Sequence, residues 1–206
     1  MPALQRPFNT LNSVAFLESV LGQASHADVR YEGLRKIAVF RLVKAARHYS
    51  EARNLVLAQI DERARWSREP PNGQWLPILE FPAAIDDCIG DLAIAIKSIK
   101  ALKSMNPPPP NIKAFLAQWK STINAVKSFR DESQHIDEKI IGGKTNGGPH
   151  IPFTSQDGRY CLLNGYELDL VEMGRFIEAL ADFLALTFPG LELNARTTGS
   201  WWLKSE

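Results

Sequence analysis

Hydrophobic residues recur every three or four positions along most of the chain, a spacing that predicts long amphipathic helices. Four such segments are predicted, at residues 31–66, 83–105, 112–141 and 168–188. Breaks rich in proline or glycine separate them, at residues 70–73, 107–110 and 142–149. A shorter helix is expected ahead of the four, beginning at Thr10 or Asn12 and ending at Gly22.

Each of the four segments carries one apolar stripe. The stripes are Val39, Leu42, Val43, Ala46, Tyr49, Val56 and Ile60; Ile85, Ile89, Leu92, Ile96, Ile99 and Leu102; Ile112, Leu116, Trp119, Ile123, Val126, Ser133 and Ile140; and Leu170, Met173, Ile177, Leu180 and Leu184. Asn111 is expected to cap the third helix. Helices that bury such stripes and are joined by short breaks pack most simply as an up-and-down bundle.

A different pattern lies between the third and fourth helices. Residues 151–154 and 159–163 are predicted to be short strands joined by a turn at 156–158, and a second turn at 164–165 closes the hairpin. The expected fold class is therefore all-α: an up-and-down four-helix bundle with an additional N-terminal helix and a small β-hairpin inserted before the last helix.

Three regions follow from this pattern. Residues 1–30 are an N-terminal arm with the short helix, residues 31–190 are the helical bundle, and residues 191–206 are a C-terminal tail. The tail holds Trp201 and Trp202, which are expected to dock onto the bundle because an exposed tryptophan pair promotes aggregation. Contact with a partner is the alternative.

Composition and charge narrow the class of protein. The 206 residues are 45% hydrophobic and 23% charged, which is ordinary for one globular domain with a sizeable core. A net charge of +1 excludes a strongly basic nucleic-acid coat but allows local basic faces. Cys88 and Cys161 are far apart, which predicts reduced thiols. The chain has no apolar run long enough to span a membrane, so a cytoplasmic protein is expected.

The densest group of chemically capable side chains lies at residues 129–138, late in the third helix. Each residue is rotated by ~100° around the helix axis relative to the one before it, so with Trp119 as the origin Arg130 lies at ~20° and Asp137 at ~0°. Both charged side chains therefore lie on the apolar stripe. An unpaired charge there is costly, so Arg130 needs either a carboxylate partner or a solvated cleft. Candidate partners are Asp137 on the same helix and Asp86, Asp87 or Asp91 on the second. One interpretation is thus a buried clamp that sets helix register.

His135 falls at ~160° on the same helix, away from the stripe. One helix alone therefore does not bring Arg130 and His135 to the same phosphate. Asp131 and Glu138 each lie about one turn from His135, where carboxylates favour the imidazolium and orient the ring. A general acid or base requires such orientation. The alternative is a solvated surface histidine.

Basic residues near this stretch suggest phosphate binding. Lys113, Lys120 and Lys127 are seven residues apart and form a line toward Asp131. The first helix adds basic faces, with Lys36, Arg41, Lys44, Arg47, Arg53, Arg63, Arg65 and Arg68. Together they would attract a phosphate backbone, although a solvated lysine face is the simpler interpretation of any one lysine. The sequence has no glycine-rich nucleotide loop and no His/Cys metal cluster, so neither a cofactor nor a metal is predicted.

The motif Arg130-Asp131 with His135 five positions after the arginine, inside the third long helix of an all-α bundle, resembles the signature of the HEPN superfamily. Active members of that superfamily are metal-independent endoribonucleases. The resemblance covers roughly residues 30–188. It implies a homodimer whose motif helices face a shared cleft, so that Arg130 and His135 act in one composite site.

The resemblance also implies a reaction. A ribose 2′-hydroxyl attacks the adjacent phosphate, giving a cyclic phosphate and a free 5′-hydroxyl; His135 moves the proton, Arg130 stabilises the phosphoryl charge, and Asp131 orients one of them. The lysines Lys113, Lys120 and Lys127 would bind RNA. Asp137 stands where HEPN toxins with a nucleotidyltransferase antitoxin often carry tyrosine, which argues against that branch.

Two functional hypotheses follow. The first is a metal-independent endoribonuclease of toxin or phage-defence type, a cytoplasmic homodimer acting on RNA, with an antitoxin or another regulatory protein as a further partner. The alternative is a non-catalytic HEPN-like module that binds RNA, nucleotide or a protein partner and keeps Arg130 as a helix clamp.

Overall fold

The computed structural model describes residues 1–6, 8, 11, 28–65, 80–146, 148–187, 191–192 and 202–203. The expected short helix after Thr10 or Asn12 lies outside the described residues, as does most of the first linker. The side chains of the Trp201–Trp202 pair and of Arg63, Arg65 and Arg68 also lie outside them. The predictions for these segments therefore stay predictions.

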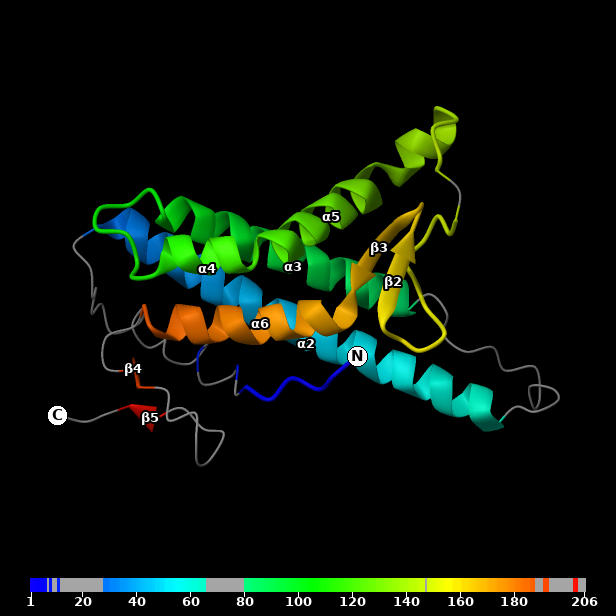
Figure 1. Ribbon diagram of the computed structural model, residues 1–206, viewed down its shortest axis with the longest axis horizontal. Coiled ribbons are helices and arrows are strands. Elements are labelled where there is room, and N and C mark those ends of the chain that lie inside the picture. Colours follow the sequence, from blue (N-terminus) through cyan, green and yellow to red (C-terminus); the bar gives the residue numbers. More distant parts are fainter. Residues whose placement is uncertain are drawn as a thin grey trace.

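Helices dominate the described chain, as the hydrophobic spacing predicts. They are α2 (Val29–Arg65), α3 (Glu80–Leu102), α4 (Ile112–Gln118), α5 (Lys120–Ile141) and α6 (Leu170–Ala185). Figure 1 shows α2 and α3 running in opposite directions, the α4–α5 segment turning back, and α6 reversing again. The predicted stripes of α3 and α6 are buried throughout, and α2 packs along α3. The protein is thus mostly helical.

The third predicted helix is broken at Trp119, which separates α4 from α5. Trp119 has φ −97° and ψ 14°, outside helical values. Its N–H still donates to the Phe115 carbonyl at 3.1 Å, and its own carbonyl accepts from Ile123 N–H at 2.9 Å. Because helical hydrogen bonds continue on both sides, the hydrophobic spacing carries no sign of the break. Asn111 is the N-cap of α4, as predicted, but it adopts a left-handed φ of 59° and its side chain makes no capping hydrogen bond.

The predicted hairpin is part of a three-stranded antiparallel sheet, in the order β1 (Phe153–Thr154), β2 (Tyr160–Leu163) and β3 (Tyr166–Asp169). The third strand was not predicted, and α6 begins only after it. Asn164 and Gly165 have φ of 45° and 80°, and this two-residue turn pairs Leu163 with Tyr166. A turn of that kind needs a strand on each side.

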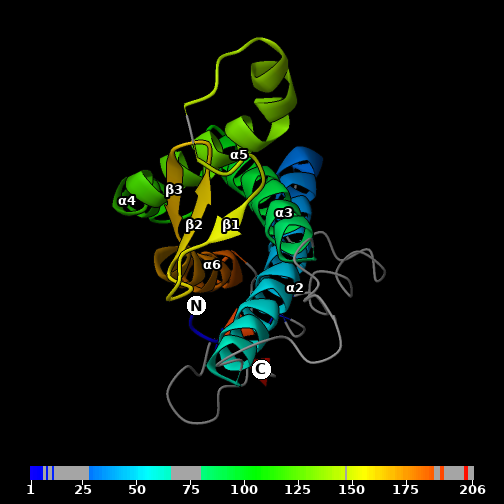
Figure 2. The ribbon, with the colours of Figure 1, turned by 90° about the vertical axis from the view of Figure 1, so that its right-hand side faces the viewer.

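Asp169 joins the sheet to the last helix. It is the final residue of β3 and the N-cap of α6, where its carboxylate accepts from the N–H groups of Val171 at 2.8 Å and Glu172 at 3.0 Å. The sheet lies between α5 and α6 and contacts both (Figures 1 and 2). It thereby braces the helix that carries the Arg130–His135 motif.

The C-terminal part of α5 leaves the body of the protein, as the two views show (Figures 1 and 2). Ile140 and Ile141 are 47% and 87% exposed, and Asp137 is exposed as well. The predicted stripe on this helix is therefore wrong beyond Ser133. Its apolar spacing continues, but the neighbouring helices have diverged and offer no surface to pack against.

Two observations bear on the environment of the protein. Among the described helices, none is long and apolar enough to cross a membrane. Cys88 and Cys161 are both buried and free, and burial raises the pKa of both thiols, that of Cys161 to about 12. Neither thiol is therefore a nucleophile at neutral pH.

Candidate functional site

Arg130 is half-buried on α5 and lines a groove between α3 and α5, the α3–α5 groove. The groove has a volume of about 250 Å³. Its lining comprises Ala93, Ile96, Lys97 and Lys100 from α3 and Ile123, Val126, Lys127 and Arg130 from α5. Four of these side chains are cations and four are small or aliphatic, so Arg130 lies in a basic groove with an apolar floor.

The predicted carboxylate clamp does not form. Within the described part of the chain, Arg130 makes no ion pair. Asp86 instead accepts a hydrogen bond from the Ser133 hydroxyl, at 2.5 Å. Asp91 is buried against α2, where Arg41 donates to it at 2.7 Å and Lys44 lies 3.5 Å away. Asp86 and Asp91 thus bind other partners. Of the two environments expected for Arg130, a carboxylate partner or a solvated cleft, the structure shows the solvated cleft.

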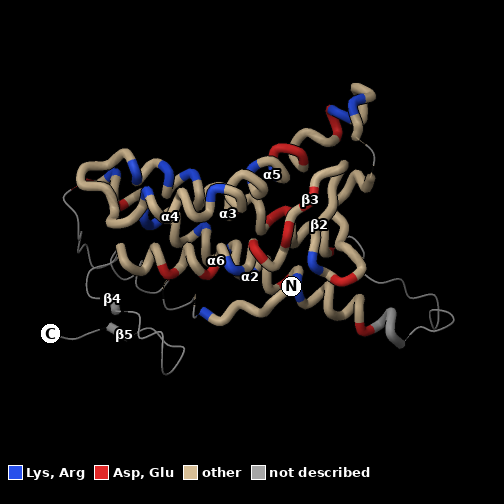
Figure 3. Tube along the Cα trace, viewed as in Figure 1, with Lys and Arg blue, Asp and Glu red and all other residues tan. Residues whose placement is uncertain are grey.

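Lys and Arg gather where the end of α3 lies beside α4 and the first part of α5, whereas Asp and Glu lie in the middle of α5 and on β3 (Figure 3). Among the described residues, no carboxylate lines the α3–α5 groove. Cations gathered without counter-charges attract anions, and their field is focused by an apolar floor.

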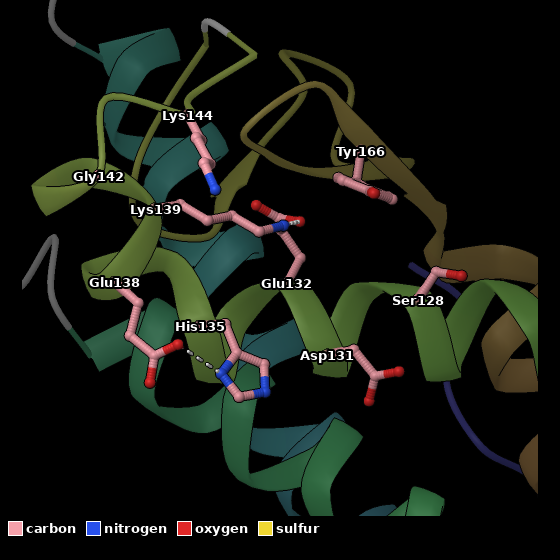
Figure 4. A pocket seen from close by; sticks show the side chains of 9 residues that line it. All are labelled: Ser128, Asp131, Glu132, His135, Glu138, Lys139, Gly142, Lys144 and Tyr166. Carbon is pink, nitrogen blue, oxygen red and sulfur yellow. Dashed lines mark hydrogen bonds and ion pairs between the residues drawn. The ribbon is translucent and has the colours of Figure 1, made fainter.

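His135 lines a different and more open cavity, the His135 groove, with a volume of about 610 Å³. The groove is lined by Ser128, Asp131, Glu132, His135, Glu138, Lys139, Gly142, Lys144 and Tyr166. The His135 side chain is 56% exposed, and its Nδ1 lies 3.3 Å from the Glu138 carboxylate (Figure 4). Glu138 therefore orients the ring, and Nε2 has no partner among the described residues. That nitrogen is available to exchange a proton.

Asp131 lies one turn before His135 and projects from the same side of α5 (Figure 4). Between these two side chains, which the structure describes, there is no hydrogen bond or ion pair. The contact to the imidazole comes from Glu138, so the orienting role expected of Asp131 falls in this single chain to its neighbour. Asp131 stays close enough to add negative charge to the groove.

A buried carboxylate that the sequence did not single out anchors this part of α5. Glu132 is 2% exposed and accepts hydrogen bonds from Lys139 and, at 2.5 Å, from the amide of Asn164. The Asn164 side chain also accepts from the N–H of Asn146 at 2.8 Å. Glu132 thus ties α5 to the β2–β3 turn and, through it, to the loop that follows α5. The seven-residue spacing from Glu132 to Lys139 was the available signal, since it puts both on one side of a helix.

The same network sets the charge of Glu132. Burial alone raises the pKa of its carboxyl, but the hydrogen bonds from Lys139 and Asn164 outweigh burial and lower that pKa below its ordinary value. The Lys139 ammonium lies 5.9 Å from the centroid of the Tyr166 ring, in cation–π range. Lys139 is therefore held at the edge of the His135 groove.

We expect Glu132→Gln to lower the free energy of unfolding by about 1–2 kcal/mol at neutral pH, because it removes the charge that holds Lys139 while sparing the bond to Asn164. A carboxyl with a lowered folded pKa stabilises above its unfolded pKa, and that stability is lost as pH falls through the folded value. The deficit of the variant should therefore shrink below about pH 4 in urea unfolding. Glu138→Gln, at an exposed site on α5, is the matched control and should leave the free energy of unfolding unchanged. An equal deficit at every pH would contradict this account.

The structure does not bring all the predicted site residues together. Arg130 and His135 line separate grooves on different sides of α5, as their angular separation predicts. Lys127 lies beside Arg130, but Lys113 is on α4 and Lys120 opens α5, and both are exposed outside the groove lining. Lys97 and Lys100 on α3, which sequence reasoning missed, take their place. Among the described residues, no cluster of three or more His, Cys, Asp or Glu side chains is arranged to hold a metal.

Comparisons of the chain with models of protein families, with curated proteins and with solved structures give no match. The resemblance to the HEPN superfamily therefore rests on the residues of the motif and on their place in the fold.

Proposed function

We propose that this protein is a metal-independent endoribonuclease of the HEPN kind, with α2, α3, the α4–α5 segment and α6 as the four helices of an up-and-down bundle. One observation carries the proposal: Arg130 makes no ion pair with any residue that the structure describes and is presented in a basic groove. Five residues later on the same helix, His135 is exposed and its ring is oriented by Glu138. Both motif side chains are therefore available for chemistry.

The proposed enzyme is a homodimer. Because Arg130 and His135 line different grooves, one chain does not direct both at the same phosphate. Pairing of two α5 helices would bring Arg130 of one protomer toward His135 of its partner, as a two-fold interface does. The projecting end of α5, with Ile140 and Ile141 exposed, supplies apolar surface on the motif helix for such pairing.

The proposed reaction needs only groups that the chain supplies. His135 Nε2 removes the proton of a ribose 2′-hydroxyl, whose oxygen bonds to the adjacent phosphorus while the bond from phosphorus to the 5′-oxygen breaks. The His135 imidazolium formed in this way returns the proton to the leaving 5′-oxygen, so the products are a 2′,3′-cyclic phosphate and a free 5′-hydroxyl. The guanidinium of Arg130 stabilises the charge that grows on the phosphoryl oxygens, and Glu138 orients the imidazole ring. A toxin or phage-defence role in the cytoplasm, with an antitoxin or regulatory protein as partner, completes the proposal.

The test is an assay of the purified chain on mixed RNA in the presence of a chelator. We expect endonucleolytic cleavage that persists without metal, fragments ending in cyclic phosphate, and a dimer by sedimentation. Absence of cleavage, or cleavage that the chelator abolishes, would contradict the proposal.

A second candidate is a non-catalytic module of the same fold that binds RNA. It is favoured by the α3–α5 groove, which is complete within one chain and does not involve His135. This candidate expects RNA to be bound by a monomer and recovered uncut, with His135→Ala indistinguishable from the parent chain. Binding of a nucleotide or of a protein partner would be its other forms.

A further inference from the structure

The α3–α5 groove has two facing basic walls. Lys97 and Lys100 are three residues apart on α3, and Lys127 and Arg130 are three residues apart on α5. Residues at that spacing are neighbours on a helix surface, about 5–6 Å apart at Cβ. Each wall therefore presents two adjacent cations to whatever lies between the helices.

The floor of the groove is apolar. It is formed by Ala93, Ile96, Ile123 and Val126. The lining thus offers positively charged donors and aliphatic surface, and the described residues contribute no carboxylate, amide or hydroxyl side chain that could accept a hydrogen bond. A ligand matched to it has acceptors at its edge and an apolar face, and it brings few donors of its own.

A sugar–phosphate strand fits this description, since the ribose 2′-hydroxyl is the one donor in each unit of its backbone. Phosphodiester oxygens are acceptors only, and the ribose and base faces are apolar enough to lie on aliphatic side chains. An extended acidic peptide would instead bring backbone N–H groups that this lining leaves unsatisfied. The volume of about 250 Å³ is also too small for a duplex, which proteins bind across broad surfaces.

We propose that Lys97 and Lys100, facing Lys127 and Arg130, form a binding groove for the backbone of single-stranded RNA. The inference deepens the proposed function, on which it rests for the identity of the strand, by assigning two α3 lysines outside the Arg130–His135 motif. It places the strand along one side of α5 and brings its phosphates to Arg130. Neither lysine takes part in the chemical step.

The test measures binding of a fluorescent, single-stranded 2′-O-methyl RNA, which cannot be cleaved because its 2′-hydroxyls are blocked. The double variant Lys97→Gln/Lys100→Gln should bind about tenfold more weakly at roughly 0.1 M salt, with a salt slope smaller by about 1.4. The control Arg30→Gln/Arg175→Gln removes the same charge from two exposed arginines on α2 and α6, outside the groove, and should leave affinity unchanged. Lys97→Arg/Lys100→Arg should retain binding, and it confirms that the charge and not the fold was lost.

The outcomes separate the groove from the catalytic proposal. Cleavage of RNA with unchanged affinity of the glutamine double variant would overturn the groove while leaving the proposed function intact. If the glutamine double variant binds RNA more weakly but the parent chain does not cleave RNA, the result would support the groove and contradict the proposed catalytic function. Adenosine monophosphate or inorganic phosphate binding as tightly as the strand would overturn the strand assignment, and so would an acidic peptide that binds more tightly than RNA.

Discussion

His135→Ala is expected to lower the rate of RNA cleavage by about 10²- to 10⁴-fold, the contribution of a positioned general acid or base. Its fold should be unaffected, because the histidine is exposed and, among the described residues, its one ion pair is with the exposed Glu138 carboxylate. The free energy of unfolding should stay within about 0.5 kcal/mol of the parent. Single-turnover cleavage of an end-labelled RNA and urea unfolding measure the two quantities.

The matched control for this substitution is Gln134→Ala, at an exposed position next to His135 on α5. It should leave both the cleavage rate and the stability unchanged. If His135→Ala cleaves as fast as the parent chain, the assignment of the proton-transfer group is wrong. The RNA-binding candidate then becomes the better account of the fold.

Arg130→Ala is expected to slow cleavage by about 10²- to 10³-fold, because it removes the charge that stabilises the phosphoryl oxygens. The cost to stability should be about 0.5 kcal/mol, since Arg130 makes no ion pair in the described part of the chain. A buried clamp would instead cost about 3–5 kcal/mol on losing one partner. Cleavage rate and urea unfolding on one preparation therefore separate the two roles. Arg30→Ala, an exposed arginine in the first turn of α2, is the control.

Mixing the two inactive variants tests whether the site is shared between protomers. In a mixed dimer of Arg130→Ala and His135→Ala, one composite site loses both groups and the other keeps both. Random exchange makes about half of the dimers mixed, so activity should return to roughly a quarter of the parent value. Sites contained within single chains would give no recovery, and that result would exclude the shared cleft while leaving the single-variant losses in place.

The hydrophobic spacing was sufficient to locate α2, α3 and α6, because contacts between residues three and four apart act within each helix. It did not show the break at Trp119, across which helical hydrogen bonding continues. It also missed β3, although the Asn164–Gly165 turn was visible and requires a following strand. Both differences lie at the ends of helices or strands, where neighbouring segments compete to form hydrogen bonds with the same backbone N–H and C=O groups.

The candidate site was predictable in part. The types of side chain on α5 and the divergence of Arg130 from His135 follow from the sequence and helical geometry. The environment of Arg130 could not be predicted in this way, because Asp86 and Asp91 were equally placed to pair with it. In the structure, Asp86 accepts a hydrogen bond from Ser133 and Asp91 accepts one from Arg41. Which charged side chains form pairs depends on the angle at which two helices cross and on the other hydrogen-bond donors nearby.

The sequence by itself determined that the chain is mostly helical and that its chemically capable residues lie on one helix, since both follow from the local order of side chains. Only the tertiary structure decided that Arg130 is solvated, that Lys97 and Lys100 face it, and that Glu132 is buried under the β2–β3 turn. Those features join residues about 30 positions apart. They arise from the angle at which α5 leaves α3 and from the sheet packed against it, which no local spacing encodes.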